Sequence, residues 1–180
     1  MRKSMEADHE RSRRITSVEM LQLWDERLSR KASITRKLAE QFNFEQAKSV
    51  WNQEKVTLSE SQRNSFLAAF PEIENDIHNS IEEGDGKFTI TEKYSALLRW
   101  ELVSYLNSLE TILSSWHHNI ADKNMLEEQF EYLVSPENNH FLLQEFRKAA
   151  GGAKSYPCIE TFVQNLNQKR VPAPGKQKIA

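Results

Sequence analysis

The chain has 180 residues, of which 38% are hydrophobic and 28% charged, and its formal net charge is −2. This length fits one domain with a sizeable core, and the near-neutral charge gives no electrostatic reason to expect a nucleic-acid partner. The single cysteine, Cys158, excludes an internal disulfide and any zinc site with two thiolates. The sequence contains no apolar run of about eighteen residues, so it predicts no membrane-spanning helix.

Residues 1–15 are mostly charged and contain few large apolar side chains, so we expect a flexible charged arm there. Its arginines allow weak contact with an acidic membrane surface, but its acidic residues offset their charge. No apolar segment of the kind found in secretory signals follows the arm. Together with the single cysteine, this leads us to expect a cytoplasmic protein.

The helical domain is expected over residues 16–167. Ser17 is a good N-cap, and apolar residues at helical spacing predict a long helix from Val18 to Phe42, bent near residues 30–33. The same spacing predicts three shorter helical segments, at 44–51 after Asn43, at 59–70 with a capping box of Ser59 and Gln62, and at 73–83.

The most regular pattern in the chain runs from Thr91 to His118 and predicts one long central helix. Its apolar residues recur at steps of three and four, as on one face of an α-helix. They are Tyr94, Leu98, Leu102, Tyr105, Leu109, Ile112 and Trp116. Leu97, Leu106 and Leu113 widen this face, so we expect neighbours to pack on more than one side of the helix.

Asp122 and Ser135 are expected to cap the helices that follow, and Pro157 opens a final short helix. Residues 168–180 are expected to form a disordered tail. The predicted fold class is therefore all-α, a single helical-bundle domain of six or seven helices around a central helix at about 91–118.

One turn before the central helix resembles a calcium-binding loop. Read with Gly86 at the obligatory glycine position, residues 81–92 are similar to the EF-hand loop. The oxygen ligands would be Glu83, Asp85 and Glu92. The first ligand position holds Ile81, which offers no oxygen, so we favour an ordinary turn that leads into a helix capped by Thr89 and Glu92.

A group of polar residues forms a candidate functional or buried cluster: Asn107, Glu110, His117, His118 and Arg147. Burial raises a carboxyl pKa, so a partly buried Glu110 is a candidate base. The favoured alternative is that Glu110 pairs with an arginine, for example Arg147, or satisfies a helix end. The adjacent histidines point about 100° apart on a helix and cannot chelate one ion together, although Asp122 is placed to join either one.

Cys158 lies at the predicted start of the final helix, where a helix N-terminus can lower a thiol pKa. A thiol nucleophile also needs a base, and the neighbouring sequence supplies none, so an inert, half-buried cysteine is favoured. We assign no catalytic residue, metal or cofactor from the sequence.

The second half of the chain resembles an uncharacterised bacterial all-helical domain of unknown function. The resemblance rests on the segment Tyr105 to Glu110, on Ile120 to Asp122, on Arg147, on Tyr156 with Pro157, and on Phe162. It covers residues 16–166 in outline and implies no established reaction. Members of the family often carry an N-terminal membrane helix, which this sequence lacks, and some resemble accessories of mobile elements or phage-defence loci.

Common enzyme signatures are missing from the sequence: it has no glycine-rich phosphate loop, HExxH, CxxC or GxSxG. No histidine follows an arginine at the spacing typical of small helical ribonucleases. We therefore expect an interaction or regulatory module that contacts a protein partner or a second copy. The alternatives are an enzyme or ligand binder with a site built across helices, and a calcium binder at 81–92.

Overall fold

The computed structural model describes residues 2–75, 81–84 and 87–170. Its α-helices are α1 (Arg2–Arg27), α2 (Arg30–Ala39), α3 (Phe44–Asn52), α4 (Glu60–Ala69), α6 (Glu92–His117), α7 (Lys123–Phe130), α8 (Gln144–Ala149) and α9 (Pro157–Arg170). The strands are β1 (Val56–Leu58), β2 (Ile81–Gly84), β3 (Lys87–Ile90), β4 (Val134–Ser135) and β5 (His140–Phe141). The all-α class is confirmed, with eight α-helices in the described residues rather than six or seven.

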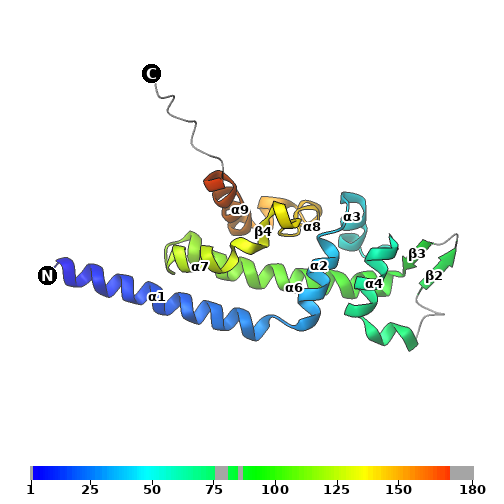
Figure 1. Cartoon of the computed structure of the whole chain (residues 1–180), viewed down its shortest axis with the longest axis horizontal. Coiled ribbons are helices and arrows are strands. Elements are labelled where there is room, and N and C mark those ends of the chain that lie inside the picture. Colours follow the sequence, from blue (N-terminus) through cyan, green and yellow to red (C-terminus); the bar gives the residue numbers. More distant parts are fainter. Residues whose placement is uncertain (1, 76–80, 85–86, 171–180) are drawn as a thin grey trace, which may run out of the picture.

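Helix α6 is the predicted central helix, and it runs through the middle of the molecule (Figure 1). All seven residues of its predicted apolar face are at most 4% exposed. Helices α2, α3 and α9 pack against it. Leu97 was expected to widen the buried face, but its side chain is 41% exposed, so the described residues cover that edge of the helix only in part.

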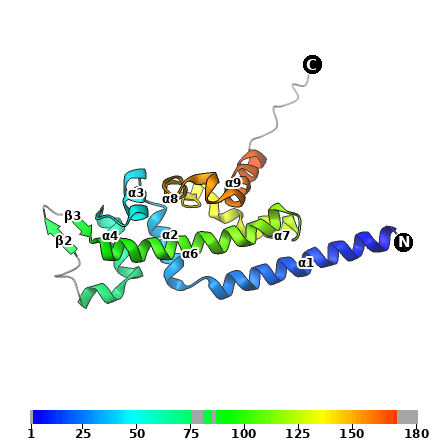
Figure 2. The same ribbon diagram turned by 180° about the vertical axis from the view of Figure 1, so that it is seen from behind.

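Helix α1 begins at Arg2, well before the N-cap predicted at Ser17, because no glycine or proline interrupts the charged segment. Ser17 is buried instead, and its hydroxyl accepts a hydrogen bond from the Asp122 amide at 2.8 Å. Residues 5–15 are exposed. Figures 1 and 2 both show the N-terminal end of α1 extending past α7. The predicted arm is therefore helical, and its flexibility stays a prediction.

Helix capping agrees with the sequence at Ser59 and Asp122 but not at Ser17 or Thr89. Asn43 and Ser59 form capping boxes with residues three positions later, and the bend expected near 30–33 occurs just before α2, where Ser29 accepts from the Ala32 amide. The box predicted for Thr89 is wrong, because Thr89 lies in β3. Thr91 is the N-cap of α6 and makes no side-chain capping bond.

The helix predicted over 73–83 is wrong where the structure describes it. A 3₁₀ turn covers Pro71–Asn75, and β2 pairs antiparallel with β3, placing Ile81 opposite Ile90. Strand β1 pairs with the other edge of β3, which gives the sheet order β1-β3-β2. Isoleucine and threonine favour strands, and here cross-strand pairing outweighs the helical spacing of the isoleucines.

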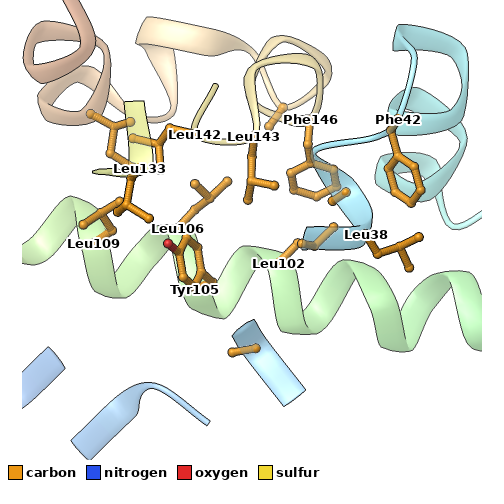
Figure 3. Close-up of a cluster of buried hydrophobic side chains, with 14 of the residues drawn as sticks. Leu38, Phe42, Leu102, Tyr105, Leu106, Leu109, Leu133, Leu142, Leu143 and Phe146 are labelled. Carbon is orange, nitrogen blue, oxygen red and sulfur yellow. The ribbon is translucent and has the colours of Figure 1, made fainter. Parts of the chain in front are cut away.

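In the second half, Asp122 caps α7 as predicted, accepting from the Asn124 and Met125 amides. The helix expected after Ser135 starts only at Gln144, as α8. Between them, Leu142 and Leu143 adopt positive φ angles of 50° and 56°. Figure 3 shows both leucine side chains pointing towards α6, where they are fully buried. Of the predicted tail, residues 171–180 lie outside the described residues, whereas α9 includes 168–170.

Candidate functional site

Glu110 contacts the N-terminus of α9. One carboxylate oxygen accepts from the Cys158 amide at 2.8 Å, and the other accepts from the Ile159 amide at 2.9 Å. A helix N-terminus has unsatisfied amide donors and a partial positive charge, and both favour a carboxylate at this position. Glu110 thus satisfies a helix end, which is one of the roles considered from the sequence.

Arg147 pairs with Glu160 of α9 rather than with Glu110. Its side chain is 3% exposed, and Nε donates to the Leu142 carbonyl at 2.7 Å, while Nη2 donates to the Phe141 carbonyl at 3.4 Å. The suggested Glu110–Arg147 pair is therefore wrong. Arg147 holds residues 141–143, which we call the 141–143 loop, and connects this loop to α9.

The remaining candidates lie apart from these two contacts. Asn107 is exposed on α6, and His117 and His118 are exposed at its C-terminal end. Asp122 contacts neither histidine in the structure; it caps α7 and lies 3.7 Å from Arg14. The five residues of the predicted cluster consequently do not converge on one site.

The calcium prediction is only partly covered by the structure. Asp85 and the side chain of Glu83 lie outside the described residues, and Glu92 is exposed at the start of α6. Within the described part of the chain, no group of three or more histidine, cysteine or acidic side chains is placed to hold a metal ion. Calcium binding at 81–92 stays a prediction.

Cys158 is 7% exposed in the first turn of α9. Burial, followed by the adjacent Glu110 carboxylate, raises the pKa of its thiol to about 11. The thiol is consequently protonated at neutral pH, as expected for an inert structural cysteine.

The most strongly buried ion pair in the described residues is one that the sequence analysis missed. Arg36 and Glu40 of α2 are each 6% exposed at the side chain, with Nη1 3.4 Å from Oε1. Glu40 also accepts from the Phe141 amide at 3.1 Å and from the Leu143 amide at 3.2 Å. Glu40 therefore binds the amides of the 141–143 loop, while Arg147 binds its carbonyls.

Burial perturbs the ionisation of Glu40 and Tyr105 in the cluster that they form with Arg36. Burial raises the pKa of Glu40 above its ordinary value of 4.5, against the opposing hydrogen bonds from the 141–143 loop and the charge of Arg36. Burial also raises the pKa of Tyr105, whose hydroxyl has no hydrogen-bond partner among the described residues. Because backbone amides and Arg36 occupy the Glu40 carboxylate, we interpret the cluster as structural.

The raised pKa of Glu40 predicts a pH dependence of stability. Between the ordinary pKa and the higher folded-state pKa, the folded chain binds more protons than the unfolded chain, so the free energy of unfolding falls as pH rises through that window. Urea unfolding of the wild type and of Glu40→Gln from about pH 4 to about pH 8 measures this. The stability of the wild type relative to the variant should decrease with pH; an increase would contradict the burial argument.

A polar cleft lies between the end of α6, α7 and α9. Its volume is about 530 Å³. Glu127 lines the cleft; it accepts from Trp116 Nε1 and from Asn165 Nδ2, each at 3.0 Å, and pairs with Lys169. Because Glu127 is bonded to groups from both α6 and α9, it joins the three helices. His117 lines the cleft and is the only member of the predicted cluster that does.

A second surface feature is an exposed, uncharged row of residues along α6, which we call the α6 stripe: Leu97, Trp100, Ser104, Asn107 and Thr111. Trp100 is 67% exposed, the largest exposed fraction among the large apolar residues of the described chain. The five residues follow steps of three and four, so they lie on one face of the helix. Of the predicted cluster, Asn107 belongs to this stripe.

Comparison of the chain with protein-family models, with curated proteins and with solved structures gives no match. No helix in the described residues combines the length and the apolar character that crossing a membrane requires.

Proposed function

We propose that this chain is a non-enzymatic interaction module that binds a helix of a partner protein on the α6 stripe. The observation that carries the proposal is the 67% exposure of Trp100 among the uncharged residues of the α6 stripe. Tryptophan is enriched among the residues that contribute most to protein–protein binding. An aromatic side chain left in water on a rigid helix is suited to anchor a partner.

The spacing of the α6 stripe supports a helical partner. Steps of three and four match the seam along which two helices pack, with a large anchor at Trp100 and short side chains at Ser104 and Thr111 that permit close approach. The core of an interface is depleted in charge, and none of the five stripe residues is charged, while Lys93 and Glu101 flank the stripe.

The expected setting is regulatory or accessory. The resemblance of the second half of the chain to a bacterial domain of unknown function supports such a role, including one beside mobile-element or phage-defence genes. The single cysteine supports a reducing, cytoplasmic compartment. A second copy of the chain, joined stripe to stripe, is the other form of partner to be tested.

Site-specific photo-crosslinking in the native host identifies the partner. Benzoylphenylalanine replaces Ser104 in the middle of the stripe, and a control places it at Ala68, which is exposed on α4. One adduct of defined mass from position 104 alone is expected. Its mass distinguishes a foreign partner from a second copy. Absence of an adduct, or the same adducts from both positions, would contradict a docking role for the stripe.

Trp100→Ala then measures the contribution of the anchor. Affinity for the identified partner should fall by about 30-fold, as for a central interface tryptophan, and the free energy of unfolding should change by less than about 0.5 kcal/mol. Phe44→Ala is the matched control, because Phe44 is 42% exposed but lies on α3. Equal losses of affinity in both variants would exclude a specific role for the α6 stripe.

A further inference from the structure

The polar cleft between α6, α7 and α9 has the size of a small-molecule site. Its volume of about 530 Å³ lies within the range of about 300–1,000 Å³ typical of ligand pockets. Its walls come from three helices that Glu127 joins, so it is a built feature of the fold. None of its lining residues belongs to the α6 stripe, so the cleft is separate from the proposed docking surface.

The acidic group of the cleft is already neutralised. Glu127 uses one oxygen for the Trp116 indole and the Asn165 amide, and the other for Lys169. A ligand therefore meets no unpaired carboxylate among the lining residues.

The basic group that remains is Lys123 at the start of α7. It has no carboxylate partner among the described residues, and its Nζ lies over the Trp116 ring, 5.0 Å from the ring centroid. An ammonium group in this position retains hydrogen-bond donors that can turn to an anion. His117 lines the same cleft and adds a further nitrogen group.

Carboxamides make up much of the remaining wall. The side chains of Asn124, Gln164 and Gln168 line the cleft and make no hydrogen bond within the described chain. Each carboxamide both donates and accepts, so together they match the hydroxyl groups of a polar ligand better than an apolar surface.

From this donor set we propose that the cleft binds a small polyhydroxylated organic anion, with its phosphate or carboxylate at Lys123 and its hydroxyl groups along the carboxamides of α7 and α9. A bare ion would leave most of the volume empty, since one water molecule takes about 30 Å³ of liquid. A neutral polyol would leave Lys123 unpaired. A single molecule with an anionic group and a hydroxyl-bearing body both fills the cleft and pairs with Lys123.

The test uses the full-length chain, and it follows the four tryptophan indole N–H signals by NMR during titration with four probes. The probes are glucose 6-phosphate, gluconate, glucose and inorganic phosphate. The Trp116 signal should shift saturably with one or both organic anions, at an affinity at least about tenfold above that of glucose or phosphate. Comparing glucose 6-phosphate with gluconate distinguishes a phosphate from a carboxylate.

Lys123→Met should lower the affinity for the organic anion about tenfold. Lys48→Met, at an exposed lysine on α3, should leave that affinity unchanged. Gln164→Ala provides a second variant if Lys123→Met alters the fold, and it should weaken binding severalfold. The proposal is overturned if no probe shifts the Trp116 signal at about 10 mM. It is also overturned if glucose or phosphate alone binds as tightly as the organic anions, or if both lysine variants bind equally.

Discussion

Replacing Arg147 by methionine is expected to lower the free energy of unfolding by about 3–5 kcal/mol, the usual cost of breaking a buried ion pair. The side chain is 3% exposed and bonds Glu160 and two carbonyls of the 141–143 loop. Methionine fills much of the volume but donates no hydrogen bond, so Glu160 and the carbonyls lose their partner. Thermal unfolding should show a midpoint lowered by about 10 °C.

Two variants separate the loss of Arg147 hydrogen bonds from a general charge effect. Arg147→Lys keeps the charge but not the planar set of donors, and it should be intermediate in stability. Lys148→Met removes the neighbouring exposed charge, which lies 2.7 Å from Glu145, and should cost less than about 1 kcal/mol. If Arg147→Met proved no more destabilising than Lys148→Met, the role of Arg147 in holding the loop would be refuted.

Glu40→Ala is expected to lower the free energy of unfolding by about 3 kcal/mol at neutral pH. The substitution leaves the Phe141 and Leu143 amides without their acceptor and the buried Arg36 without its partner. Without those hydrogen bonds, little compensates for the unfavourable positive φ angles of the loop leucines. Urea unfolding should show a lower midpoint, with Glu40→Gln less affected because its amide oxygen still accepts.

The double variant of Glu40 and Arg147 tests whether both side chains stabilise one structure. Each single substitution releases the 141–143 loop. The two substitutions together should therefore lower the free energy of unfolding by less than the sum of their separate effects, by about 1 kcal/mol or more. Glu40→Ala combined with Asp122→Ala, which removes the cap of α7, is the control and should be additive. Additivity in both double variants would show that the two buried charges act independently.

The sequence predicted α6 to within one residue at each end, because an apolar face repeated over seven turns leaves a single helical interpretation. Ser59 and Asp122 were equally predictable as caps, since capping depends on residues two or three positions away. These successes all rest on local interactions.

The failures involve partners far apart in sequence. Glu40 and the Phe141 amide are 101 positions apart, and no pattern around Glu40 indicates that a loop of the second half will bind it. Ile81 was misread because its spacing from Ile73 fits a helix, while β3 supplies a strand partner that the spacing does not show. The polar cleft is lined by three helices, so no single segment of the sequence predicts its hydrogen-bond donors.

The long N-terminal helix has a mechanical consequence. Residues 2–12 of α1 extend beyond the contact that Arg13, Arg14 and Ser17 make with Asp122, and at 1.5 Å per residue they span about 16 Å. A helix is stiff over this distance, so the segment acts as a lever pivoting at that contact. A tilt of about 10° at the pivot moves the first turn by about 3 Å. Small rearrangements at the α6–α7 junction are thus amplified at the far end of α1.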